Sequence, residues 1–193
     1  MDLANPDKFH LLLSEKDKSL AMKVGGFNIE NSLDEKLLGV TIDNKLTFNP
    51  HVAKLCCKAS QELHALSPIG KYMNFSQKKI IMNSFISSQF GYCPLVWMFH
   101  SRGLNNRMNR IHERSLRMVY QDYKSSLEDL LEKDESFTVH ERNIQTLCLE
   151  LYKVAWGVSP PIMRLVFPTK QNINYPWENI FQTCNIRTVT WGS

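Results

Sequence analysis

The chain has 193 residues, of which 43% are hydrophobic, and a formal net charge of +4 at pH 7. This length favours one domain, or one domain with a piece of a second, and the composition permits a buried core and excludes wholesale disorder. The mildly basic charge permits an acidic partner without requiring one, so the distribution of the charge matters more than its sum.

Short strands are expected in the first 48 residues. The run KLLGVTI at 36–42 has the strongest pattern, and Gly39 within it indicates a bulge or a close backbone approach. Gly25 and Gly26 supply the positive φ angles that a tight hairpin turn requires. So small a sheet needs further partners to be stable. The expected strands lie at 8–14, 20–24, 27–29 and 36–42.

A first helix is predicted to begin with Asn49 as N-cap and Pro50 at the first helical position. Apolar residues then recur three or four positions apart, which is typical of a helix that buries one face. Pro68 and Gly70 are expected to end the helix. The predicted apolar face consists of Val52, Leu55, Cys56, Ala59, Leu63 and Leu66.

A second helix is predicted with Ser76 as N-cap, broken by Gly91 and Pro94 before an aromatic segment at 95–99. Aromatic residues at such density can stack on bases, but in a small helical domain they are more often core. Tyr92 and His100 are the members expected to be partly exposed to solvent. The apolar residues assigned to this helix are Ile80, Ile81, Phe85 and Phe90.

A third helix is predicted over 104–120, with a core stripe and a basic face. At about 100° per residue, four of its arginines fall within an arc of roughly 80° that flanks the stripe. We call Arg107, Arg110, Arg114 and Arg117 the arginine arc. The predicted core stripe consists of Leu104, Met108, Ile111, Ser115, Met118 and Val119.

Two more helices are expected before the sequence loses its period at Pro168. Ser125 and Glu128 can form a capping box for a short helix through Leu131. Thr138 and Glu141 can do the same for a longer helix that reaches Trp156 and stops at Gly157. Its predicted inward face consists of Ile144, Leu147, Cys148, Leu151 and Val154.

The cysteines and the hydropathy pattern bear on the compartment. Five cysteines without regular spacing predict reduced thiols, most of them buried, and no zinc site. The sequence has neither a signal peptide nor a run of 18 apolar residues. We therefore expect an intracellular protein, nuclear or cytoplasmic, with no membrane partner. The cysteines are Cys56, Cys57, Cys93, Cys148 and Cys184.

The arginine arc is the most specific local feature of the sequence. Guanidinium groups on one helical face suit phosphate oxygens, with which they form charge-assisted bidentate hydrogen bonds. Lys71, Arg102 and Lys124 could extend this basic patch. The alternative is a solvated helix face whose arginines are partly paired with Glu113 and with acids of another helix.

Catalytic signatures are absent from the sequence. Metal-dependent polymerases and nucleases need acidic side chains that converge on divalent ions, and no Asp-Asp pair, D-x-D or phosphate-binding glycine loop occurs here. His112 and Glu113 are neighbours on a helix and therefore do not face each other.

Three blocks of sequence, in this order and spacing, resemble the C-terminal part of the reverse transcriptases of non-LTR (LINE-type, jockey-like) retrotransposons. The similarity covers nearly the whole chain and includes the tail NIRTVTWGS. The blocks are NPDKFHLLLS at 5–14, KLLGVTIDNKLTFNPHV at 36–52 and SFISSQFGYCPLVWMFHSRGLNNRMNRIHERSLRMVY at 84–120.

The resemblance implies an α+β fold: a small antiparallel β remnant of a polymerase palm, followed by a mainly helical thumb. Residues 1–48 would end the palm, 49–167 would form the thumb and 168–193 an irregular tail. Lys8 matches the family's lysine near the nucleotide phosphates, and Leu37, Leu38 and Gly39 match its primer grip. The implied partner is an RNA/DNA template–primer, contacted through Arg107, Arg110, Arg114, Arg117, Lys71 and Arg102.

The family's catalytic aspartates, which hold Mg²⁺ in the intact enzyme, have no counterpart in this sequence. They would lie before Met1, so we expect a fragment that lacks most of its palm and its fingers, contains no cofactor and does not extend a primer by itself. A helical structural or interaction domain, or a pseudogene product without independent activity, is the alternative.

Overall fold

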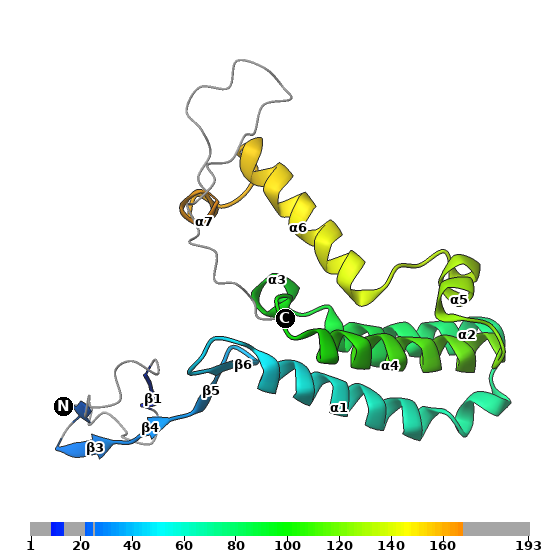
Figure 1. Cartoon of the computed structure of the whole chain (residues 1–193), viewed down its shortest axis with the longest axis horizontal. Helices are drawn as coiled ribbons and strands as arrows, with labels where there is room; N and C mark the ends of the chain where they lie inside the picture. Colours follow the sequence, from blue (N-terminus) through cyan, green and yellow to red (C-terminus); the bar gives the residue numbers. More distant parts are fainter. Residues whose placement is uncertain (1–8, 14–21, 25, 168–193) are drawn as a thin grey trace. The chain divides into compact units, whose positions relative to one another are not determined.

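A computed structural model describes residues 9–13, 22–24 and 26–167. The chain divides into two compact units, Met1–Asn143 and Ile144–Ser193. The fold is α+β and mainly helical (Figure 1). Lys8, the turn before it and the tail from Pro168 onward lie outside the described residues, so the expectations for them stay predictions.

Three small sheets of two strands each precede the helices. Two of them are antiparallel as predicted, whereas β1 (Leu11–Leu12) pairs with β4 (Asn31–Ser32) in parallel. The antiparallel pairs are β2 (Met22–Val24) with β3 (Phe27–Ile29), and β5 (Asp34–Leu37) with β6 (Val40–Asp43).

The single strand predicted over 36–42 is wrong, because its centre is a hairpin turn. Leu37 pairs with Val40, and the two residues between them have positive φ angles, 48° at Leu38 and 87° at Gly39. This is the backbone of a type I′ turn, whose twist matches that of the flanking strands. Glycine accepts such a φ at no steric cost, whereas leucine does not. Gly39 therefore marks a turn rather than a bulge.

Replacing Leu38 by asparagine should stabilise this turn. The Leu38 side chain is 83% exposed, so its removal loses little packing, and asparagine tolerates the left-handed conformation better. We expect a gain of about 0.5–1 kcal/mol in the free energy of unfolding, measured by urea denaturation. Leu37→Asn, on the adjacent strand, is the control and should give no gain. A Leu38→Asn protein no more stable than wild type would contradict the strain assigned to this turn.

The β5–β6 hairpin is attached to the helices by specific hydrogen bonds. The Tyr92 hydroxyl donates to the carbonyl of Leu38 at 2.8 Å, and the Thr41 amide donates to Nδ1 of His51 at 3.2 Å. Asp43, at the end of β6, accepts the amides of Thr47 and Phe48 at 3.1 and 2.6 Å. The hairpin therefore leads directly into the first helix.

Helix α1 (Asn49–Leu66) has the predicted span, but its cap differs from the prediction. Phe48, with φ of 56°, occupies the N-cap position, and Asn49 is the first helical residue. The Asn49 side chain instead accepts a hydrogen bond from the Ser101 amide at 3.2 Å. The predicted apolar face is confirmed: Leu55 and Leu66 are half-buried, and Val52, Cys56, Ala59 and Leu63 are buried.

The second helical region is less regular than predicted. Asn74, not Ser76, caps its first helix by a reciprocal capping box with Gln77. Two of the apolar residues assigned to the predicted helix, Ile80 and Phe85, are exposed. The 3₁₀ helix η2 (Ile69–Tyr72) joins α1 to this region. The region consists of α2 (Phe75–Ile81), the π-helical turn η3 (Met82–Ile86), the 3₁₀ helix η4 (Ser87–Phe90) and α3 (Pro94–Trp97).

The π-helical turn explains which residues of this region are buried. A π-helical turn contains more residues than an α-helical turn, so it shifts the buried face along the sequence, here to positions four residues apart. Met82, Ile86 and Phe90 are buried at this spacing. The aromatic segment that follows is only partly core, because Trp97 is fully buried whereas Phe99 is 75% exposed. Tyr92 is exposed and His100 half-buried, as expected.

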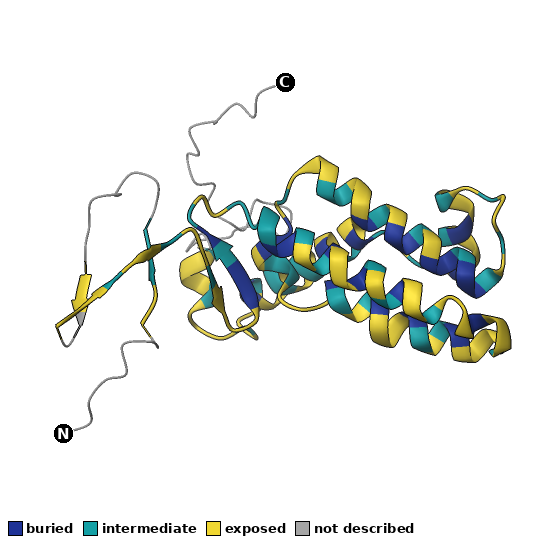
Figure 2. Ribbon diagram, turned by 90° about the horizontal axis from the view of Figure 1, so that it is seen from below, coloured by how far each residue is buried: buried dark blue, intermediate teal, exposed yellow. Residues whose placement is uncertain are grey.

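Helix α4 (Arg102–Tyr120) supplies the centre of the core. Its predicted stripe is confirmed, with Leu104 half-buried and the other members buried, and Leu116 and His112 join it. Buried positions lie along one side of the helices and exposed positions along the other (Figure 2). Helix α4 packs against α1 and α2.

The last helices confirm one predicted capping box and correct the other. Ser126 and Asp129, one residue later than predicted, cap α5 (Leu127–Asp134). Thr138 and Glu141 cap α6 (Val139–Ala155) as predicted. The predicted inward face of α6 is wrong at Ile144 and Cys148, which are exposed. The short helix α7 (Met163–Val166) follows.

The cysteines are less buried than expected. Cys56 is buried, whereas Cys57, Cys93 and Cys148 are exposed, and all four are free thiols. Cys184 lies outside the described residues. Within the part of the chain that the structure describes, no helix is long and apolar enough to cross a membrane.

A buried polar cluster joins α4 to its neighbours. Asp134 accepts the Tyr120 hydroxyl at 2.8 Å and pairs with Lys79 at 3.0 Å. Burial lowers the pKa of His112 to about 4. The positive charge of Arg142 also lowers this pKa, whereas the negative charge of Asp134 raises it. His112 is therefore neutral in the folded protein at neutral pH.

The lowered pKa of His112 predicts a loss of stability in mild acid. Between pH of about 6.5 and 4, His112 binds a proton in the unfolded chain but not in the folded chain. The free energy of unfolding therefore has its full value above pH 6.5 and falls as the pH approaches 4. We expect a loss of roughly 3 kcal/mol across this window. Urea denaturation at several pH values measures it. His112→Gln should lose less stability over the same window, and a wild-type stability that stays constant would exclude a buried neutral His112.

Candidate nucleic-acid interface

The arginine arc lies beside the core stripe of α4, on the flank of the helix next to α1. Arg107, Arg110 and Arg114 are exposed, and no carboxylate of the described residues forms an ion pair with them. Arg117 is partly buried, pairs with Glu113 at 2.6 Å and donates to the carbonyl of Ser125 at 3.3 Å. Three of the four guanidinium groups are therefore available to a ligand, and the fourth is held in place.

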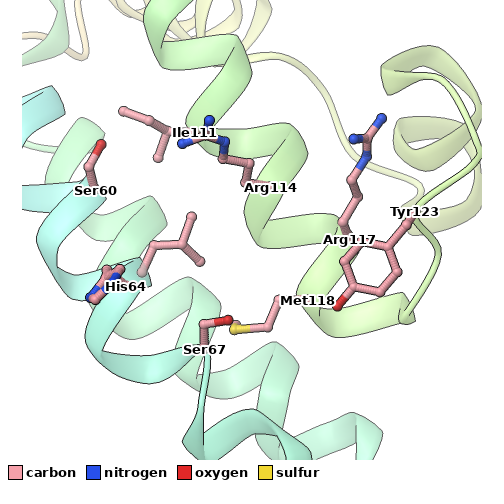
Figure 3. A pocket seen from close by; sticks show the side chains of 9 residues that line it. Ser60, His64, Ser67, Ile111, Arg114, Arg117, Met118 and Tyr123 are labelled. Carbon is pink, nitrogen blue, oxygen red and sulfur yellow. The ribbon is translucent and has the colours of Figure 1, made fainter.

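Helix α1 runs parallel to α4 along this basic side. The two helices begin together where Ser101 binds Asn49, and Arg107 lies close enough to Cys56 for its charge to oppose the rise that burial causes in the pKa of that thiol. Farther along, the two helices border a cavity of about 520 Å³ (Figure 3). Its lining residues are Ser60, Leu63, His64, Ser67, Ile111, Arg114, Arg117, Met118 and Tyr123. We call it the arginine cavity.

The arginine cavity has an apolar floor and a polar rim. Leu63, Ile111 and Met118 supply the floor. Figure 3 shows Arg114 extending from α4 toward α1, and Tyr123 entering from the segment after α4. No carboxylate is among the described residues that line the cavity. A ligand with an anionic group and an apolar body would find complementary groups here.

The other predicted basic residues lie at the two ends of α4. Gly70 is buried against the side chain of Met118, which places exposed Lys71 near the end of α4. Arg102 is the first residue of α4, roughly 22 Å along the helix axis from Arg117. The arc and these two residues therefore follow the whole length of the helix rather than forming one compact site.

An acidic group limits the basic surface beyond α4. Hydrogen bonds from the hydroxyl and the amide of Ser125, and one from the amide of Lys124, lower the pKa of Asp122 to about 2. Asp122 also pairs with Lys133 at 3.6 Å. This carboxylate therefore stays ionised at neutral pH, and Lys124, an exposed residue beside it, adds little net positive charge to the patch.

The primer-grip-like residues do not meet the arginine cavity. Gly39 borders a second cavity of about 520 Å³, on the other flank of α1, and Leu37 and Leu38 adjoin it in the hairpin. Lys36, Lys54 and Lys58 line this second cavity, where Lys54 pairs with Asp34 at 3.4 Å. Two separate basic surfaces therefore flank α1.

Sequence reasoning missed several residues that the structure brings to these cavities. Ser60, His64 and Ser67 recur at helical spacing on α1 and face the arginine arc, so their period could have indicated a polar stripe. Lys54 and Lys58 lie four residues apart, and this spacing could likewise have indicated that both lie on one face of the helix. No local pattern indicated that Tyr123 would join them.

A metal site does not contribute to either cavity. No group of three or more His, Cys, Asp or Glu side chains within residues 9–13, 22–24 and 26–167 could hold a metal ion. The Mg²⁺ of the polymerase family therefore has no fitting ligand set among these residues.

No family model, curated protein or solved structure matches this chain.

Proposed function

We propose that this protein binds nucleic acid, with an RNA–DNA template–primer duplex lying along the arginine arc of α4. In this proposal residues 49–167 act as the thumb of a non-LTR retrotransposon reverse transcriptase and work in the nucleus or cytoplasm. The observation that carries it is the availability of Arg107, Arg110 and Arg114, which have no carboxylate partner among the described residues.

The spacing of the arc supports contact with a phosphate backbone. Successive members of the arc are three or four residues apart, which corresponds to about 5 Å along the helix axis. A strand of duplex nucleic acid carries one charge per roughly 3.4 Å, so each guanidinium could reach a different phosphate. Phosphate contacts position a duplex but do not read its sequence. We therefore propose binding without sequence preference.

A second function, a protein-interaction domain, has one observation in its favour. Several large apolar side chains are exposed, among them Tyr72 at 90%, Leu38 at 83% and Phe99 at 75%. Exposed apolar surface of this kind is common at protein interfaces. Light scattering after size exclusion separates the two functions: a partner-free monomer favours the nucleic-acid proposal, and concentration-dependent association favours the interaction domain.

Binding to a labelled RNA–DNA duplex tests the proposal. Fluorescence anisotropy at about 50 mM salt should show saturable binding in roughly the micromolar range, as expected for binding driven by phosphate contacts. Unlabelled duplexes of unrelated sequence should compete equally. The absence of binding under these conditions would refute the proposal, and strong preference for one sequence would refute the phosphate-based mode.

A further inference from the structure

We infer that the arginine cavity between α1 and α4 binds one nucleoside monophosphate unit, either free or at an unpaired strand end. This inference rests on the proposed nucleic-acid binding and specifies what the cavity adds to it. A duplex contacts the outer surface of the arc, whereas the cavity would hold a single nucleotide whose base is not paired.

The polar side of the cavity suits a phosphate. Arg114 has no carboxylate partner in the described part of the chain and extends toward α1 (Figure 3). Arg117 points away from Arg114 (Figure 3) and is held by Glu113 and by the carbonyl of Ser125, so Arg114 is the guanidinium that a phosphate in the cavity would meet. Arg114 could hold the phosphate by charge-assisted bidentate hydrogen bonds. Ser60 and His64 provide further hydrogen-bonding groups on the opposite wall.

The apolar side of the cavity suits a base. Leu63, Ile111 and Met118 form a floor that a free phosphate would leave uncovered. Tyr123 is 71% exposed at the rim, where its ring can stack on the face of a base. Stacking on an aromatic side chain is the usual way in which proteins hold unpaired bases. Ser67 could bond to the edge of the base.

The size of the cavity agrees with a ligand of this class. Its volume of about 520 Å³ lies within the range of sites that bind small molecules, and its combination of apolar floor and few polar groups is typical of them. Inorganic phosphate would use only the polar wall, and an unphosphorylated nucleoside only the floor and Tyr123. A nucleoside monophosphate uses both.

Methyl NMR of the full chain titrated with AMP tests the inference. AMP should shift the methyl signals of Leu63, Ile111 and Met118 with a Kd in about the millimolar range. Inorganic phosphate and adenosine, at equal concentration, should each bind at least about fivefold more weakly. If AMP shifts none of the three signals, or if phosphate alone binds as tightly as AMP, the cavity is not a nucleotide site.

Variants separate this inference from the proposed function. Tyr123→Ala should weaken AMP binding by about tenfold and leave the affinity for a blunt duplex unchanged. Tyr72→Ala removes another exposed tyrosine, which does not line the cavity, and should change neither. Unchanged AMP binding in Tyr123→Ala would overturn the stacking role. Duplex binding without AMP binding would refute the inference alone, and the reverse result would refute the proposed function alone.

Binding to a duplex with a single-stranded overhang distinguishes a strand end from a free nucleotide as the source of the ligand. Tighter binding of the overhang duplex than of the blunt duplex, lost in Tyr123→Ala, would assign the cavity to a strand end. AMP binding without any gain from the overhang would assign it to a free nucleotide.

Discussion

A protein in which all four arginines of the arc are replaced by glutamine should bind an RNA–DNA duplex about a hundredfold more weakly at low salt. Because the variant neutralises fewer phosphates, its binding releases fewer counterions from the duplex. The slope of log K against log salt should therefore flatten by about 3. Arg114→Gln alone should have a larger effect than Arg117→Gln, because Arg117 is already paired with Glu113. Anisotropy titrations at several salt concentrations measure both quantities.

The matched control removes the same charge from other surfaces. Its four exposed lysines lie outside α4, and their replacement by glutamine should reduce the salt slope far less than loss of the arc. Equal losses for the two quadruple variants would show that net charge, not the arc, determines binding. The control replaces Lys23, Lys36, Lys58 and Lys133.

The Trp97→Ala protein should be destabilised by about 3–5 kcal/mol, the usual cost of removing a large buried aromatic residue. Trp97 is fully buried, and its indole N–H donates to the carbonyl of Tyr92 at 2.8 Å. Its ring lies 6.3 Å from that of His51 and 5.9 Å from that of His100, so it joins α1 to the segment before α4. Urea denaturation should show a large fall in the midpoint or a chain unfolded in buffer.

Phe99→Ala is the control for this prediction. Phe99 belongs to the same aromatic segment but is 75% exposed, so its loss should cost less than about 0.5 kcal/mol. Similar losses of stability in the two variants would contradict the placement of Trp97 in the core and Phe99 at the surface.

Helices with a sustained apolar period were predictable from the sequence. The spans and the buried faces of α1 and α4 agree with the prediction because each depends only on residues three or four positions apart. The predictions that were wrong concern regions with an unusual backbone conformation. Leu38 occupies a left-handed turn position that leucine disfavours, and the π-helical turn at Met82–Ile86 shifts the buried face without any compositional signal.

The candidate site also has one part that was predictable from the sequence and one part that was not. The arginine arc was predictable, since its members lie on one helix and their spacing alone places them on one face. The cavity beside it was not, because Ser60 and His64 come from α1 and Tyr123 from the segment after α4. A single sequence contains no local pattern that brings such distant residues together.

The salt dependence of duplex binding by the wild-type protein tests the central claim most directly. If the arginine arc lies along a phosphate backbone, log K should fall linearly with log salt between about 50 and 200 mM, with a slope of about −3 to −4. A slope near zero, or no binding at the lowest salt, would contradict the claim that α4 is a nucleic-acid-binding surface.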